Sequence, residues 1–251
     1  YDIWLHTPSS PPLTYKGRVP IISNASSFPL QMFQEMPRPY IWFFHDYWPC
    51  KYRLFYPMAE VCKNCYLRER WLPIFTKTAL IVWLSPLHRK SWLWVYPELE
   101  AVPYHLAPSP VDPELFYDMR QPRQGVVAVE ALDFKGGAYV MQWAKELPDV
   151  GVSLVGGDMG ELLPNIRRVS YVPYSEMNAV YNSHEALLHL PQSPSPFDRT
   201  CAEAYLAGGR IIGNENIGAL SYPWFRSREQ VAEHCRNSPK EFWTKIEEAL
   251  R

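Results

Sequence analysis

The amino-acid sequence predicts an α/β protein of two domains, each built on a doubly wound parallel sheet. Three observations support this fold class. The chain has 251 residues, which is long for one domain and sufficient for two. Hydrophobic residues make up 47% of it and charged residues 20%, as in a globular protein with a large core. In the second half, short apolar runs alternate with segments of helical periodicity, which is typical of parallel sheets.

The second half shows the clearer pattern of elements. Its expected strands are nearly continuous in apolar residues, whereas its expected helices repeat apolar residues every three or four positions. We expect strands at 126–129, 152–155, 169–172, 186–190 and 210–213, and helices at 136–147, 176–181 and 200–207. In such sheets ligands bind beyond the carboxyl ends of the strands. The polar segments that follow these strands are therefore the candidate functional site.

The first half alternates in the same way but less regularly. We expect strands at 2–6, 40–44, 79–84 and 102–106, and helices at 68–78 and 86–95. Two proline-rich polar segments, 107–113 and 119–123, have the composition of a linker. We therefore divide the chain into domains 1–118 and 119–251. The last expected helix, 239–251, is amphipathic, and we expect it to pack back against the first domain.

Composition argues against several classes of protein. A net charge of -1 argues against a dedicated nucleic-acid-binding protein, and 15% aromatic residues argue against a disordered chain. The longest uncharged apolar run, 78–87, is shorter than the ~20 residues of a transmembrane helix. No leader peptide is visible. Five cysteines, an odd number, do not suit a secreted disulfide scaffold, so we expect a cytoplasmic protein.

Five short motifs occur in a characteristic order. They are His45-Asp46 after an aromatic strand, 111–116 (VDPELF), Lys135-Gly136, a Val-Gly-Gly turn at 155–157, and 194–204 (PSPFDRTCAEA). Together they resemble the retaining GT-B glycosyltransferases of the family 4-like, group 1 type, most strongly over residues 107–220. The resemblance implies a GT-B-like fold of two Rossmann-like domains. It also implies a reduced N-terminal domain, because no glycine-rich turn precedes the segment that the chain start resembles.

The resemblance also implies an activity. Such an enzyme transfers a sugar from a UDP-, GDP- or ADP-sugar donor to a glycan, lipid-linked or other small acceptor, with retention of configuration. The leaving phosphate assists a front-face displacement, and neither a metal nor a further cofactor is required.

Glu203 is the first residue that chemistry singles out. A ribose diol is best held by a carboxylate, which accepts two hydrogen bonds, and Glu203 follows a strand near the start of a helix. Spacing leaves a second interpretation open, because Thr200 and Glu203 also form a capping box in which Glu203 bonds its own backbone. The resemblance favours ribose binding.

A diphosphate requires cations and free backbone N–H groups. Lys135 would supply a cation, Gly136 would open the following helix, and the helix start at Arg199-Thr200 would supply amides. Lys135 and Arg199 would also stabilise the charge of the leaving group. Both could instead be solvated surface cations.

The remaining site residues are implied by the resemblance. His45 would lie beside the breaking bond and act in catalysis with Lys135 and Glu203, although a lone histidine is often structural. The other residues would contact the donor: Tyr171, Val172 and Tyr174 at the base, and Ser195, Phe197, Asp198 and Gly218 near the phosphates and sugar.

Two departures from the resembled pattern concern the donor site. Ser195 stands where the family has a glutamate that contacts the donor sugar, and Glu130 stands where it has a basic residue. These departures keep an alternative open, namely a degenerate GT-B protein that binds nucleotide or glycan without turnover.

Three cysteines, Cys50, Cys62 and Cys65, follow His45 closely in the sequence. Thiolates at this spacing could hold a structural zinc ion with His45 or His88 as the fourth ligand. Reduced thiols in a loop are the simpler interpretation, and we expect no metal in the catalytic site.

Overall fold

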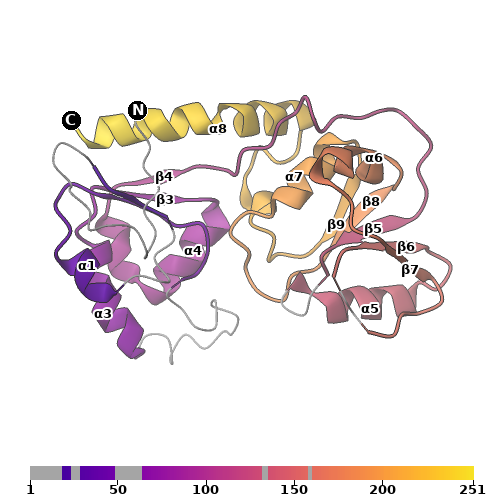
Figure 1. Cartoon of the computed structure of the whole chain (residues 1–251), viewed down its shortest axis with the longest axis horizontal. Coiled ribbons are helices and arrows are strands. Elements are labelled where there is room, and N and C mark those ends of the chain that lie inside the picture. Colours follow the sequence, from indigo (N-terminus) through magenta and orange to yellow (C-terminus); the bar gives the residue numbers. More distant parts are fainter. Residues whose placement is uncertain (1–18, 24–28, 49–63, 132–134, 158–159) are drawn as a thin grey trace.

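The computed structural model contains two parallel β-sheets with helices packed against them (Figure 1). It describes residues 19–23, 29–48, 64–131, 135–157 and 160–251. The predicted α/β class and its two Rossmann-like sheets are confirmed. The expected strand 2–6, together with Cys50 and Cys62, lies outside the described residues.

The first sheet has the strand order β1-β2-β3-β4, and every pair is parallel. Strands β2, β3 and β4 were expected, with bounds one or two residues wider. Strand β1 and helix α1 were not expected, because elements this short carry no readable periodicity. The strands are β1 (Ile21–Ile22), β2 (Ile41–Phe43), β3 (Leu80–Trp83) and β4 (Tyr104–Leu106), and the helices are α1 (Leu30–Gln34), α3 (Tyr66–Phe75), α4 (Pro86–Val95) and the short 3₁₀ helix η1 (Pro97–Ala101).

Aromatic side chains fill the core of the first half. Trp42 of β2 meets Trp71 and Phe75 of α3 edge-on, with ring centroids 6.0 and 4.9 Å away. Trp92 of α4 and Trp83 of β3 belong to the same buried cluster. This core accounts for much of the unusual tryptophan content of the chain, since each large ring buries extensive apolar surface.

The second sheet has the strand order β7-β6-β5-β8-β9, again all parallel. In chain order this is 3-2-1-4-5, so the direction of winding reverses between β5 and β8. The strands are β5 (Val126–Val129), β6 (Val152–Val155), β7 (Ile166–Val169), β8 (Ala186–His189) and β9 (Arg210–Gly213), and the helices are α5 (Gly137–Glu146), α6 (Met177–Asn182) and α7 (Arg199–Leu206), with 3₁₀ turns η3 (Tyr174–Glu176) and η4 (Ala219–Ser221).

Two predicted elements in the second half were wrong. Strand β7 ends at Val169 rather than beginning there, because Ile166–Val169 pair with β6 and the chain then leaves the sheet toward Pro173. The last helix, α8 (Arg228–Ala249), begins eleven residues before the expected start at Pro239, which lies inside it. Ser227 caps α8 by accepting a hydrogen bond from the Gln230 N–H.

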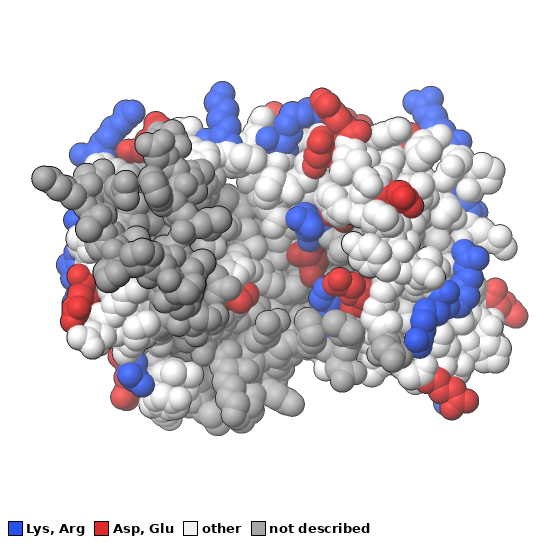
Figure 2. Space-filling model, viewed as in Figure 1, with Lys and Arg blue, Asp and Glu red and all other residues white. Residues whose placement is uncertain are grey.

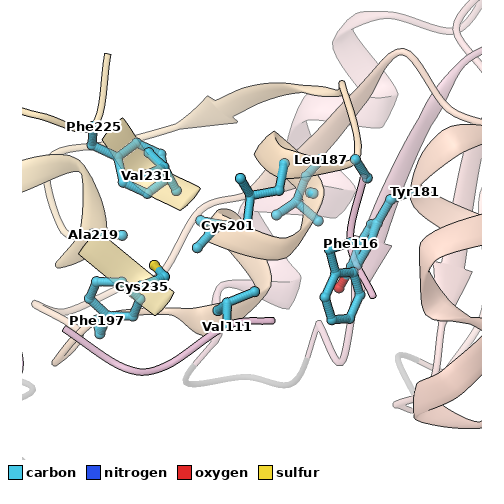
Figure 3. Close-up of a cluster of buried hydrophobic side chains, with 14 of the residues drawn as sticks. Val111, Phe116, Tyr181, Leu187, Phe197, Cys201, Ala219, Phe225, Val231 and Cys235 are labelled. Carbon is cyan, nitrogen blue, oxygen red and sulfur yellow. The ribbon is translucent and has the colours of Figure 1, made fainter. Parts of the chain in front are cut away.

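Helix α8 runs along both halves of the molecule (Figure 1). Near its start, Val231 and Cys235 join a core cluster with Val111 and Phe197 (Figure 3). Near its end, Ile246 packs on Ile41, Leu80 and Val82 of the first sheet. The helix thus shares the hydrophobic cores of both sheets.

The segment between the two sheets is anchored to the second half. Val111 and Phe116 are buried in the cluster of Figure 3. The side chains of Asn178 and Asn182 on α6 accept hydrogen bonds from the backbone of Tyr117 and Met119. These proline-rich residues are therefore a packed connection, and the domain division at residue 118 stays a prediction.

The surface carries charges of both signs. Lys and Arg side chains are interspersed with Asp and Glu on the face shown in Figure 2, in line with the small net charge. Within the described part of the chain, no helix combines the length and the apolar character that crossing a membrane requires.

Candidate functional site

The topology of the second sheet locates the candidate site. In doubly wound sheets a crevice opens where neighbouring strands send their connections to opposite faces, which here is between β5 and β8. Lys135 follows β5, and the loop 190–198 with helix α7 follows β8. Chain segments far apart in sequence therefore bring Lys135, Asp198, Arg199 and Glu203 to the same edge of the sheet.

Glu203 lies on α7 with its side chain only 3% exposed. It accepts hydrogen bonds from the hydroxyl groups of Tyr174 (2.9 Å) and Tyr181 (3.1 Å), and the Arg199 guanidinium Nε lies 3.0 Å from Oε1. Burial raises the pKa of this carboxyl group, and the two hydroxyl groups and Arg199 oppose the rise. Burial and the Glu203 charge also raise the pKa of Tyr174 to about 12.

The capping-box interpretation of Glu203 is wrong. Helix α7 begins at Arg199 with Asp198 as its N-cap, so Thr200 lies inside the helix rather than before it. The carboxylate of Glu203 accordingly points to Tyr181 of α6 and Tyr174 of η3, whose hydroxyl groups donate hydrogen bonds to it. A buried carboxylate held this way is prepared to accept further hydroxyl donors.

Lys135 forms an ion pair with Glu130. Glu130 stands where the resembled family has a basic residue. Lys135 and Glu130 therefore carry opposite charges, which largely cancel. Both side chains are partly exposed, at 35% for Lys135 and 58% for Glu130. Such a pair is weak and can open at little cost when a competing anion arrives.

The loop after β8 is held by Ser195, Asp198 and His189. The Ser195 hydroxyl donates to the Asp198 carboxylate and accepts from the Gly218 N–H at 3.1 Å. His189 Nε2 lies 3.1 Å from the other Asp198 oxygen. Ser195 thus fastens this loop to the turn at Asn216, whose carbonyl oxygen accepts from the Ser195 N–H at 2.7 Å.

Two residues of the site have left-handed backbone conformations that non-glycine residues rarely adopt. Glu130 has φ 45° and Asp198 has φ 68°. Glu130 directly follows β5, and Asp198 ends the loop 190–198 that follows β8. These are the two strands at the winding reversal. Strained backbone of this kind concentrates at functional sites.

The other predicted donor residues divide into exposed and buried ones. Tyr171 is 86% exposed, Val172 is partly buried against the core, and Tyr174 joins Glu203. The Phe197 side chain is fully buried in the core, so it anchors the loop after β8. A side chain at Gly218 would collide with the carbonyl oxygens of Ser195 and Pro196, each 2.5 Å from the position of a Cβ atom.

His45 follows β2 in the first half, and its side chain is about one third exposed. Its Nδ1 lies 3.3 Å from the Ser23 hydroxyl and its Nε2 lies 3.8 Å from the Asp46 carboxylate. Burial raises the pKa of the adjacent Tyr47, and the charge of Asp198 raises it further.

Of the three cysteines predicted as zinc ligands, Cys65 lies within the described residues. Cys65, at the N-cap of α3, is a free and partly exposed thiol. Among the residues that the structure describes, no group of His, Cys, Asp or Glu side chains is arranged to hold a metal ion. Cys201 and Cys235 are buried thiols of the core.

Comparison with solved structures relates both sheets to known enzymes. Sucrose-phosphate synthase from Thermosynechococcus elongatus superimposes with a TM-score of 0.62 at 16% identity, over 93% of this chain and 72% of that protein. The UDP-forming α,α-trehalose-phosphate synthase from Burkholderia xenovorans, in complex with glucose-6-phosphate, gives 0.60 at 10% identity over 92% and 71%. HepE from Anabaena, in complex with UDP-glucose, gives 0.52 at 16% identity over 82% and 64%.

The chain has a GT-B-like fold. No protein-family description and no curated protein sequence matches it. Other trehalose-phosphate synthases of this fold are covered over only 58–66% of their length.

Several residues of the site were not anticipated from sequence. Tyr181 and His189 lie in ordinary helix or strand patterns and reach the site only because separate elements pack together. Glu130 was noted as a departure, but its pairing with Lys135 depends on the loop between them.

Proposed function

We propose that the chain is a retaining glycosyltransferase that takes a UDP-, GDP- or ADP-sugar donor and a glycan, lipid-linked or small acceptor. The observation that carries the proposal is Glu203, a buried carboxylate that two tyrosines and Arg199 hold beside the winding reversal of the second sheet. Beyond these three partners the carboxylate can accept further hydrogen bonds, which suits the two hydroxyl groups of a ribose. HepE, which has a similar fold, binds UDP-glucose. With an odd number of cysteines, we place the enzyme in the cytoplasm.

In this proposal, donor binding replaces two ion pairs within the protein by contacts of the same cations with the diphosphate. The diphosphate takes Lys135 from Glu130 and Arg199 from Glu203, and the freed Glu203 oxygen accepts from the ribose. The N–H groups at the start of α7 add to the positive potential at the diphosphate. The same cations then stabilise the leaving diphosphate, so no metal is required.

In the proposed reaction the acceptor hydroxyl attacks the sugar from the face that the diphosphate leaves, which retains the configuration. His45 stands across the cleft beside the breaking bond, and Asp46 orients its ring. Gly218 lets its turn pack closely on the Ser195 and Pro196 carbonyl oxygens, which holds the turn beside the loop after β8.

The Lys135–Glu130 pair favours a second candidate function. Since Glu130 neutralises the main phosphate ligand, the chain could be a degenerate GT-B protein that binds nucleotide or glycan without turnover. Ser195 contributes to this alternative, because its hydroxyl group is committed to Asp198 and Gly218.

Removing the Glu130 charge tests the phosphate site. We expect Glu130→Gln to strengthen UDP binding by about 1 kcal/mol, about fivefold, because Lys135 no longer has to leave an anionic partner. We expect Lys135→Ala to weaken it by about 1.5–3 kcal/mol. Isothermal titration of UDP, GDP and ADP into each variant measures both effects.

Glu185→Gln is the matched control for this experiment. Glu185 pairs with Arg210 at the amino ends of β8 and β9, away from the site, so its loss should leave UDP affinity unchanged. Unchanged affinity in both Lys135→Ala and Glu130→Gln would contradict the assigned phosphate site. Tight binding without hydrolysis or transfer from UDP-, GDP- or ADP-sugars would favour the degenerate protein.

A further inference from the structure

A groove opens between helix α5 and the turn that follows β9, and Leu190 of the loop after β8 also lines it. It encloses about 340 Å³, a volume within the range of small-ligand sites. One wall is the face of α5 that carries Tyr139, Gln142, Trp143 and Glu146, spaced so that they lie together on the helix. The other wall is the turn Asn214 to Asn216.

Two aromatic rings form the apolar part of this groove. Tyr139 is 50% exposed and Trp143 is partly buried, so both rings present surface to a ligand. Aromatic faces favour the weakly positive C–H groups of a partner, and the phenol and indole add polar edges. The C–H face of a pyranose ring offers such a partner.

The polar groups of the groove retain unused acceptor atoms. Gln142 donates its amide N–H to Glu146 at 2.6 Å, which leaves the Gln142 carbonyl oxygen and the second Glu146 oxygen. Asn216 donates its amide to the Pro191 carbonyl oxygen at 3.0 Å, which leaves its own side-chain oxygen. These acceptors suit the hydroxyl groups of a sugar.

The charge of the groove limits the class of ligand that it can bind. Glu146 and Glu215 line it, and its described lining residues include no lysine or arginine. Phosphorylated or sulfated ligands are therefore repelled, whereas neutral ones are not.

We propose that this groove is a binding subsite for one sugar ring of a neutral glycan, separate from the nucleotide site. Asn216 links the two places, because its side chain lines the groove while its carbonyl oxygen holds the backbone N–H of Ser195. A glycan in the groove would fix the turn that borders the cleft. The subsite does not depend on sugar transfer by the cleft.

The test is saturation-transfer NMR and calorimetry on the full chain with maltotriose, mannotriose and chitotriose, and with a sulfated trisaccharide as the anionic probe. At least one neutral trisaccharide should bind, the sulfated one should not, and saturating UDP should not displace the neutral one. Tyr139→Ala combined with Gln142→Ala should weaken binding at least tenfold. Trp143→Phe, which keeps a ring, should weaken it less.

Two control variants keep this test separate from the proposed function. Tyr66→Ala removes a tyrosine on α3 that is more exposed than Tyr139 (65% against 50%), and Lys135→Ala removes the proposed phosphate ligand of the nucleotide site. Both should retain trisaccharide affinity. Absence of binding by all three neutral trisaccharides, displacement by UDP, or equal loss in Lys135→Ala would overturn the subsite, whatever the outcome of nucleotide binding.

Discussion

Gly136 determines where the ammonium group of Lys135 lies. Its φ of 89° is left-handed, and a Cβ atom on it would stand 1.8 Å from the carbonyl oxygen of Leu190. The chain thus passes so close to the loop after β8 that only glycine fits. This contact brings the start of α5, and Lys135 with it, against the second element of the site.

Gly136→Ala should therefore destabilise the protein by more than about 3 kcal/mol, because the clash with a backbone atom adds to the backbone strain. The matched control is Gly160→Ala. Gly160 has a similar φ of 70°, but no described atom beyond its chain neighbours lies within 4 Å of its Cβ position, so about 1 kcal/mol of strain is the expected loss. Urea unfolding of both variants measures the difference. Equal losses would show that the contact with Leu190 is unimportant.

At the residue scale, the sequence predicted candidate site residues but did not predict the side chains that pair with them. Lys135 and Glu203 stand out because each follows a strand in a readable motif. Their partners Glu130 and Tyr181 are decided by loop conformation and helix packing, which spacing does not encode. The capping box failed for a related reason, since the left-handed Asp198 is the N-cap of α7 and the helix begins at Arg199, one residue before Thr200.

Helix α4 was predicted from sequence with both bounds correct, as were strands β5, β6 and β9. Both of its bounds agree with the expected 86–95, because Ser85 and Pro86 are strong signals for a helix start. Helix α8 was predicted poorly because Pro239 was read as a helix start, although the helix tolerates it internally.

His88 ties α4 to the ends of β2 and β3. It is fully buried and contacts the Asp46 carbonyl oxygen, the Leu84 N–H and the Trp92 indole. Burial lowers the pKa of His88 to about 3, with the positive charge of His45 adding to this and the hydrogen bond to Asp46 opposing it. The buried ring is therefore neutral over the whole physiological pH range.

This histidine should make the protein sensitive to acid. Between pH 6.5 and 3 the unfolded chain binds a proton at His88 that the folded chain does not, so the free energy of unfolding falls as the pH falls. The expected slope is up to ~1.4 kcal/mol per pH unit. His88→Gln should lower that slope by this amount in urea titrations at pH 6, 5 and 4. His234→Gln, a partly exposed histidine on α8, serves as control, and equal slopes in all three proteins would refute the assignment.

For the whole molecule, the two-sheet architecture was predictable but the way the halves are joined was only partly so. Alternating elements predicted both sheets, and an amphipathic last helix was expected on the first one. Periodicity did not show that the same helix also enters the core of the second half through Val231 and Cys235. It also did not show that the proline-rich connection is packed, because burial of Val111 and Phe116 depends on α6 to α8.

Because α8 belongs to both cores, the halves should unfold together. Ile246→Ala, in the first core, should cost about 2–4 kcal/mol, and Val231→Ala, in the second, somewhat less because fewer methyl groups are removed. Both should shift one common transition, followed by tryptophan fluorescence and circular dichroism. Exposed Leu220→Ala is the control and should change the free energy of unfolding by less than about 0.5 kcal/mol, as is usual at exposed positions. Separate transitions for the two probes in Ile246→Ala would contradict the coupling.

The position of α8 also bears on how the protein is made. Ile41, Leu80 and Val82 are synthesised long before Ile246, the residue that covers them. On the ribosome the first sheet therefore presents this apolar face while the entire second half is still being translated. Exposed faces of this kind on incomplete chains attract chaperones and promote aggregation. Any pause in translation before α8 prolongs that exposure, so the yield of folded protein depends on how steadily the second half is synthesised.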